Sequence, residues 1–188
     1  LLQLPAAAEH TWRLYSDVVP APSPFPERTP GAPAANVQLC VLPARRLWTH
    51  HTLAREVLHR PPDVLFVPAH VIPFVLPPRR LPPAVVTVHD LGYRRFPAAH
   101  SRRQRLYLDW STRWSAGAAT RVIAISEATA HDLHHFYGVN PRKIDVIYEA
   151  TVPLTAPDSL PGALPDAFLP GLPRPYALFV GTIQPRKN

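Results

Sequence analysis

The stretch Val85-Val86-Thr87-Val88-His89-Asp90-Leu91-Gly92 decides the fold class of this chain. Its first four residues favour β-structure and do not alternate in character, which is typical of a strand buried on both faces. The run stops at His89 and Asp90, and a glycine then lets the chain turn. In open α/β sheets, ligands bind beyond the carboxyl ends of parallel strands. His89 and Asp90 are therefore candidate site residues, although a buried histidine and a capping aspartate would give the same local pattern.

The composition is that of a globular chain with an excess of arginine. The chain has 188 residues, of which 46% are hydrophobic, and its net charge is +7. This charge is compatible with nucleic acid, an anionic membrane surface or phosphorylated small molecules as partners. The arginines stand in scattered pairs rather than in one basic tract, so nucleic acid is not the expected partner. These pairs are Arg45-Arg46, Arg79-Arg80, Arg94-Arg95 and Arg102-Arg103.

The cysteine content and the apolar runs indicate a cytoplasmic chain. Cys40 is the single cysteine, so no internal disulfide can form, and its apolar surroundings favour a buried thiol. No apolar run is long enough to cross a bilayer, and the first residues lack the basic start of a signal peptide.

Short apolar strands alternate with helices along the chain, which predicts an α/β fold with a Rossmann-like, doubly wound parallel sheet. The expected strands cover residues 10–15, 36–42, 63–68, 85–88, 121–125 and 144–148. The expected helices cover residues 47–60, 101–119 and 127–136. Residues 1–8 are expected to be the tail of a helix, and residues 93–97 a loop. His70 is a second histidine at a strand end. We expect residues 1–150 to form one domain, residues 151–175 to form a proline-rich linker, and residues 176–188 to be the beginning of a second, truncated Rossmann-like domain.

Four stretches in register resemble one protein family. They are Val85–Gly92, Arg121–Leu133, Tyr137–Tyr148 and Tyr176–Asn188. Together they resemble retaining glycosyltransferases of the GT-B fold, family 4, especially bacterial enzymes that transfer mannose or rhamnose. The resemblance implies an acceptor-binding N-terminal domain and a C-terminal domain that binds a nucleotide-diphosphate sugar. Against that pattern the chain, which contains no methionine, is expected to be a fragment that lacks its first strand and most of the donor domain, and to be inactive by itself.

The resemblance also implies roles for individual residues. His89 would lie close to the transferred sugar, with Asp90 beside it, and both are catalytic candidates, although Asp90 is not expected to be a nucleophile. Ser126 and Glu127 would line the cleft at a strand-to-helix junction. The alternative is that Ser126 is an N-cap and that Glu127 favours the positive end of the helix dipole.

The last stretch carries the expected donor-binding residues, which are Gly181, Thr182, Arg186 and Lys187. In the family, basic side chains at this turn bind the donor diphosphate. Thr182 stands where the family has an arginine, so Arg186 or Lys187 would supply the charge. An exposed charge pair is the alternative for these two residues.

The expected function is transfer of a mannose- or rhamnose-like sugar from a nucleotide-diphosphate sugar to a saccharide or lipid-linked acceptor, in cell-surface polysaccharide or glycan biosynthesis. No metal and no other cofactor is expected, because in the chemistry that the resemblance implies basic side chains can take the role of a metal ion. No metal-ligand spacing stands out among the histidines either. Contact with anionic lipid at the inner face of the membrane is also expected, with Arg94, Arg95, Arg102, Arg103 and Arg105 as candidates. The alternatives are a non-catalytic basic module that binds nucleic acid or an anionic surface, and a GT-B synthase of the sucrose or glycogen type.

Overall fold

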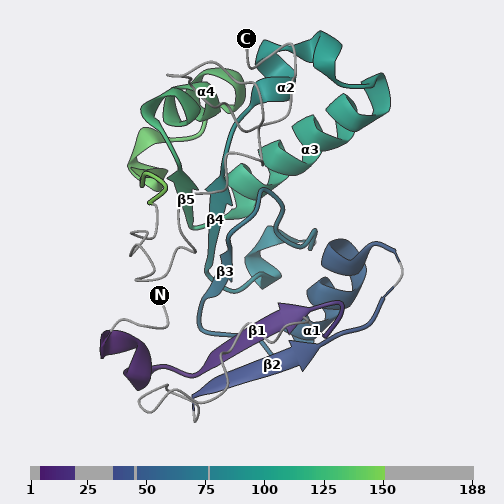
Figure 1. Cartoon of the computed structure of the whole chain (residues 1–188), viewed down its shortest axis with the longest axis vertical. Coiled ribbons are helices and arrows are strands. Elements are labelled where there is room, and N and C mark those ends of the chain that lie inside the picture. Colours follow the sequence, from purple (N-terminus) through teal and green to yellow (C-terminus); the bar gives the residue numbers. More distant parts are fainter. Residues whose placement is uncertain (1–4, 20–35, 45, 76, 151–188) are drawn as a thin grey trace, which may run out of the picture.

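The computed structural model describes residues 5–19, 36–44, 46–75 and 77–150 (Figure 1). The expected linker and the expected start of a second domain lie outside these residues. In chain order, the elements are η1 (Pro5–Glu9), β1 (Trp12–Ser16), β2 (Val37–Val41), η2 (Trp48–Leu53), α1 (Ala54–His59), β3 (Leu65–Val67), η3 (Pro78–Arg80), β4 (Ala84–Val88), α2 (Gly92–Arg95), η4 (Pro97–Ala99), α3 (Arg102–Ala118), β5 (Arg121–Ala124), α4 (Glu127–Tyr137), η5 (Pro141–Lys143) and β6 (Ile144–Val146).

All paired strands are parallel, which confirms the expected α/β class. The described strands form two sheets, β1-β2 and β3-β4-β5-β6, where the sequence pattern predicted one. Figure 1 shows β1 and β2 at one end of the molecule, below the larger sheet. Side-chain packing joins the two parts. Leu53 and Val57, from η2 and α1, pack with Leu65 and Ala84 of the larger sheet and with Tyr15 of β1.

Strand β4 lies at the centre of the larger sheet, between β3 and β5. Val86 and Val88 are completely buried, and Thr87 is nearly so. Burial on both faces explains why this strand reads as a continuous apolar run, and it confirms the prediction made from that run. The main core cluster joins these valines to Ala116 of α3 and Leu133 of α4.

Helix α3 turns its small side chains inward and part of its large ones outward. Ser111, Thr112 and Ser115 are completely buried, whereas Leu106 is 69% exposed and Trp110 is 45% exposed. The small residues let the helix approach the sheet closely. The Ser115 hydroxyl donates to the Ser111 carbonyl (2.8 Å) and accepts the Ile72 N–H (3.1 Å), so its burial is compensated.

The helix ends expected from the sequence are largely confirmed. The Ser101 side chain accepts the Gln104 N–H at the start of α3, and Gly138 ends α4 with a φ of 64°. The loop prediction for residues 93–97 is wrong, because Gly92–Arg95 form the short helix α2. Its N-terminal turn is closed by Asp90, whose Oδ1 accepts the Gly92 N–H at 2.7 Å.

Other boundaries also differ from the sequence-based prediction, most of them by one or two residues. The described part of the first expected helix is the 3₁₀ turn η1. The second begins as a π-helix, η2, after Leu47, which has a positive φ of 54°. Strand β6 ends at Val146, two residues early. Pairing explains this difference, because the ladder between β5 and β6 ends at Ala124 and Val146.

Candidate functional site

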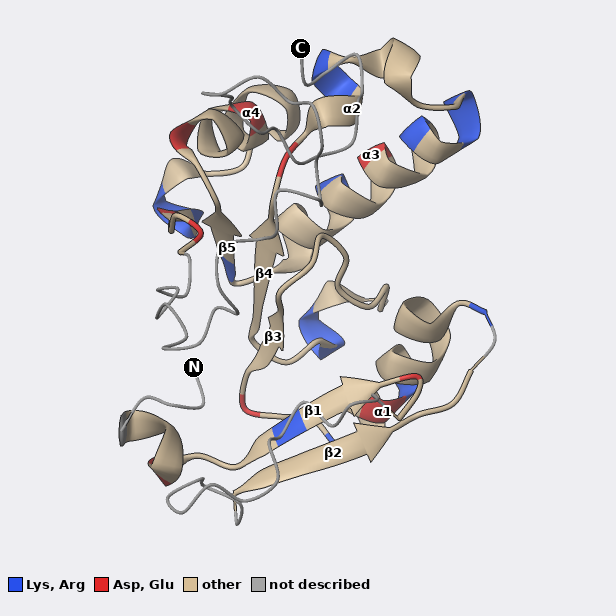
Figure 2. Cartoon of the chain, in the orientation of Figure 1, with Lys and Arg blue, Asp and Glu red and all other residues tan. Residues whose placement is uncertain are grey.

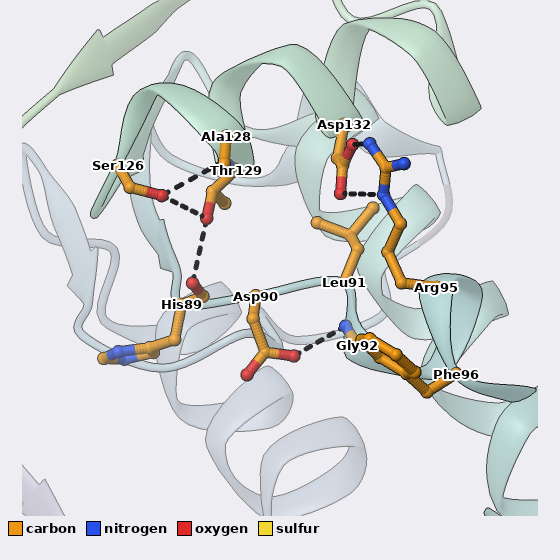
Figure 3. Close-up of a pocket in the computed structure, with 10 residues that line it drawn as sticks. All are labelled: His89, Asp90, Leu91, Gly92, Arg95, Phe96, Ser126, Ala128, Thr129 and Asp132. Carbon is orange, nitrogen blue, oxygen red and sulfur yellow. Dashed lines mark hydrogen bonds and ion pairs between the residues drawn. The ribbon is translucent and has the colours of Figure 1, made fainter. Parts of the chain in front are cut away.

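A cavity of about 280 Å³ lies where β4 and β5 end (Figure 3). Its walls come from the segment that follows β4 and from the first turns of α4, so it occupies the carboxyl edge of the parallel sheet. The lining residues are His89, Asp90, Leu91, Gly92, Arg95, Phe96, Ser126, Ala128, Thr129 and Asp132. The structure therefore brings His89, Asp90 and Ser126 together, as the sequence predicted.

The His89 side chain is held on both sides of its ring. Its Nδ1 lies 3.0 Å from Oε1 of Glu149, and its Nε2 lies 3.1 Å from the carbonyl oxygen of Pro68. The ring is 39% exposed, while the Glu149 carboxylate is 63% exposed. Both ring nitrogens thus have partners within the protein, which fixes the plane of the ring.

His70 supports the same residue from the neighbouring strand end. The backbone N–H of His89 donates to Nε2 of His70 at 3.3 Å, and the two imidazole rings stack with their centroids 5.4 Å apart. Burial lowers the pKa of His70, the neighbouring His89 lowers it further, and Asp90 acts in the opposite direction. His70 is therefore a neutral ring that accepts a hydrogen bond.

Asp90 both shapes the chain and contributes a carboxylate to the cavity. Its Oδ1 holds the turn through Gly92, as Figure 3 shows, and the residue is exposed to solvent. The capping interpretation of Asp90 is thus supported, and it is compatible with a ligand-facing role.

Ser126 and Thr129 connect helix α4 to the backbone of His89. The Thr129 hydroxyl donates to the His89 carbonyl at 3.0 Å and lies 3.0 Å from the Ser126 hydroxyl. Because the Thr129 proton is used for that carbonyl, Ser126 donates to Thr129, and it also accepts the Thr129 N–H at 3.2 Å. The N-cap interpretation of Ser126 is confirmed, and the same hydroxyl lines the cavity (Figure 3).

An ion pair between Arg95 and Asp132 forms another wall. The Arg95 Nε donates to Asp132 Oδ2 at 3.0 Å, and its NH2 group contacts the other carboxylate oxygen. The hydrogen bond from Arg95 holds the pKa of Asp132 below its usual value, so the carboxylate stays charged although the residue is buried. The positive charge of Arg95 is compensated by Asp132.

Glu127 does not join the other predicted residues. It lines a second cavity of about 330 Å³, together with His131 and His134. Its place in the first turn of α4 fits the interpretation that it favours the helix dipole. In the described part of the chain, no group of three or more His, Cys, Asp or Glu side chains could hold a metal ion.

The predicted donor-binding residues, Gly181, Thr182, Arg186 and Lys187, lie outside the described residues. Their roles remain predictions. None of the helices in the described ranges has the length and apolar character needed to cross a bilayer.

Three residues that orient His89 were not among the predicted site residues, namely His70, Thr129 and Glu149. His70 and Glu149 each follow a strand, so the rule that strand ends meet at one edge could have found them. Thr129 had a weaker signal, its position three residues after a predicted N-cap. The arrangement as a whole offers a carboxylate and a compensated guanidinium around a space for a polar ligand, with the fixed imidazole of His89 at its edge (Figure 3).

The family comparison covers most of the chain. The family model described as Glycosyltransferase Family 4 matches residues 5–151, which include every described residue of the site. No curated protein matches the chain.

Proposed function

Because the chain belongs to glycosyltransferase family 4, we propose that it contributes the acceptor-side half of an enzyme that transfers a hexose from a nucleotide-diphosphate sugar. The sugar is mannose- or rhamnose-like, and the acceptor is a saccharide or a lipid-linked saccharide of cell-surface glycan synthesis. The reaction takes place in the cytoplasm.

The observation that carries this proposal is the cavity at the end of β4. Its volume of about 280 Å³ lies at the lower end of the roughly 300–1,000 Å³ usual for small-molecule sites, so it holds one sugar ring more readily than a whole nucleotide sugar. The Asp90 carboxylate offers charge and hydrogen-bond acceptors to hydroxyls there, and the rigidly held His89 lies beside it. A parallel-sheet edge with such residues supports sugar transfer better than it supports a non-catalytic basic module.

The charge of the leaving diphosphate has to be offset as the glycosidic bond breaks. We assign this task to Arg186 and Lys187, which follow Gly181 and Thr182 in the sequence. In this scheme basic side chains take the role of a metal ion, and no further cofactor is required.

The proposal is tested by measuring transfer from a panel of nucleotide-diphosphate sugars with the complete gene product. We expect one donor to be used, and we expect His89→Ala to lower kcat/KM at least about a hundredfold because an oriented group at the reacting centre is lost. Asp90→Asn keeps an oxygen for the Gly92 N–H but removes the negative charge, so we expect a loss of at least about tenfold with a folded protein.

The control is His51→Ala, since His51 is an exposed histidine away from the cavity, and its activity should equal that of the wild type. A protein that transfers no sugar but binds DNA with strong salt dependence would overturn the enzyme proposal in favour of a nucleic-acid-binding module.

A second proposal concerns contact with an anionic membrane, and it rests on the outward face of α3. Leu106, Tyr107 and Trp110 are 69%, 47% and 45% exposed, and the basic Arg102 and Arg103 stand in the first turn. Aromatic and arginine side chains of this kind favour the interface between water and lipid headgroups. Figure 2 shows the basic residues at α2 and at the start of α3.

The arginines of α2 are poorer candidates for lipid contact than those of α3. Arg94 pairs with Asp109 and Arg95 pairs with Asp132, so their charges are compensated within the protein. In the described ranges, neither Arg102 nor Arg103 has an acidic partner. The charge available to a lipid headgroup therefore comes from the start of α3.

Co-sedimentation with vesicles tests this contact. We expect binding to vesicles that contain phosphatidylglycerol but not to pure phosphatidylcholine vesicles, and we expect the double variant Arg102→Gln/Arg103→Gln to lose most of it. The matched control is Arg79→Gln/Arg80→Gln, which removes the same charge from the exposed 3₁₀ turn η3. Equal loss in both double variants would contradict a role for the α3 face.

A further inference from the structure

The two partners of the His89 ring are both hydrogen-bond acceptors. One is the Glu149 carboxylate, at 3.0 Å from Nδ1, and the other is the Pro68 carbonyl, at 3.1 Å from Nε2. A neutral imidazole has one N–H and one lone pair, so it can donate to only one of them. In either neutral form, a nitrogen lone pair would face an oxygen lone pair at hydrogen-bond distance. The doubly protonated ring is the form in which both contacts are attractive.

His70, by contrast, must be uncharged. Its Nε2 receives the backbone N–H of His89, so that nitrogen carries a lone pair and the ring is neutral. Its own Nδ1 is buried, and it has no hydrogen-bond partner among the described residues. The neutral ring stacks against His89 at an interplanar angle of 18°. A charged ring beside a neutral ring avoids the repulsion that two charged histidines would suffer.

We propose that Glu149 and His70 are positioning residues that hold His89 as a cation in a single orientation. Glu149 and the Pro68 carbonyl bind the two ring N–H groups, while His70 fixes the backbone and one face of the ring. This inference rests on the proposed function of the cavity. It deepens that function by making His89 a fixed positive charge beside the reacting sugar and not a general base, since a doubly protonated ring cannot accept a proton.

The consequence for ligand recognition follows from the geometry. Both N–H groups of His89 already donate to protein atoms, so the ring acts on a ligand chiefly through its charge. Glu149 compensates part of this charge, so its attraction for the phosphate groups of a nucleotide sugar acts only at short range. Water needs to reorganise little around such a charge during the reaction, because the protein has already oriented it.

The charge state of His89 is tested by imidazole ¹⁵N NMR at about pH 7.5 on the complete gene product. We expect both His89 nitrogens of the wild type to show the shifts of protonated nitrogens. In Glu149→Gln the uncharged amide no longer stabilises the cation, and we expect one nitrogen to change to the shift of an unprotonated one. The control Glu56→Gln removes a carboxylate from α1 and should leave the His89 shifts unchanged.

The role of His70 is tested by hydrogen exchange at the His89 amide. We expect protection in the wild type, loss of protection in His70→Ala, and recovery in His70→Gln, whose side-chain oxygen can accept in place of Nε2. If His70 had only a structural role, His70→Gln would not restore protection selectively at the His89 amide.

These measurements separate failure of the inference from failure of the proposed function. A wild-type His89 with one unprotonated nitrogen at about pH 7.5 would overturn the inference, even in an active transferase. A doubly protonated His89 that depends on Glu149, in a protein without sugar transfer, would keep the positioning pair and overturn the transferase proposal. In an active enzyme, we expect Glu149→Gln to lower kcat more than it raises KM, because the charge matters most as the bond breaks.

Discussion

His70 accepts the His89 N–H through Nε2, so its neutral form is the one that fits the site. The chief reason for its lowered pKa is burial, and His89 adds to the effect while Asp90 opposes it. Among the described residues, His89 and Asp90 are the charged groups that shift the pKa of His70. The site is therefore sensitive to pH through a residue that need not touch the substrate.

The sign of this pH dependence follows from linkage. Unfolded His70 binds a proton near pH 6.5, whereas the folded protein binds it only at lower pH. Its contribution to stability is therefore intact above pH 6.5 and is lost as the pH falls from there through the folded pKa. A single group changes the free energy of unfolding by at most about 1.4 kcal/mol per pH unit.

Urea unfolding at about pH 7.5 and about pH 5.5 measures the effect. We expect the wild type to lose more stability between these conditions than His70→Gln does. His50, whose pKa is also lowered by burial, is present in both proteins and cancels in the comparison. Equal losses in the two proteins would show that His70 does not titrate as described.

At the scale of single elements, the two serine N-caps offer a matched pair. Ser101 caps α3 and Ser126 caps α4, each by accepting the N–H three residues on. We expect Ser101→Ala and Ser126→Ala each to cost about 1 kcal/mol of stability. Only Ser126 connects through Thr129 to the His89 carbonyl, so only Ser126→Ala should also lower transfer activity. Thermal unfolding together with a transfer assay checks both parts, and equal activity of the two variants would contradict the link.

Two glycines form a second matched pair, and we expect their replacement by alanine to change stability in opposite directions. Gly138 has a φ of 64° and Gly117 lies in α3, and a Cβ at either position would meet no heavy atom within 4 Å. Backbone conformation alone therefore decides the outcome. We expect Gly138→Ala to destabilise the protein by about 1 kcal/mol, and Gly117→Ala to stabilise it by up to about 1 kcal/mol. Denaturant unfolding distinguishes the signs, and a stabilising Gly138→Ala would contradict the left-handed cap.

The sequence predicted these elements well where the signal was local. The caps at Ser101 and Ser126, the glycine end at Gly138 and the buried run of β4 all follow from nearest neighbours. The prediction failed for α2, because basic and aromatic residues resemble a loop and the turn depends on one side-chain hydrogen bond, from the Gly92 N–H to Asp90. The large residues of α3 also did not indicate that serine and threonine side chains form its buried face.

At the scale of the whole molecule, the described chain has two apolar clusters. One joins α3 and α4 to the centre of the larger sheet, and the other joins α1 to β3 and to Tyr15 of β1. The class of fold could be predicted because strand and helix alternation is a pattern along the chain. The division into two sheets could not, since it depends on which backbone edges meet.

The candidate site was predictable in part for the same reason. His89 and Asp90 were found from their position at a strand end, and Ser126 was found from the family resemblance at the junction of a strand and a helix. Glu149 approaches His89 from the far end of the described chain, and only the order of strands in space makes them neighbours. Glu127, adjacent to Ser126 in sequence, faces a different cavity because consecutive helical residues point in different directions.

The two clusters predict two regions of different local stability. Val57 is completely buried in the smaller cluster, so we expect Val57→Ala to increase amide exchange in β1, β2 and β3. Amides of β5, which belong to the larger cluster, should keep nearly the protection of the wild type. Native-state hydrogen exchange measures this, and a uniform loss of protection over both sheets would show that they unfold as one unit.

The contacts that hold His89 also have a consequence for synthesis on the ribosome. Pro68 and His70 precede His89, but Thr129 follows it by 40 positions and Glu149 by 60 positions. At translation rates of about 5–20 residues per second, Glu149 is added about 3 to 12 s after His89. The nascent chain can therefore pair β3 with β4 while the histidine still lacks the carboxylate that orients it, and the candidate site is completed seconds after the strand that carries it.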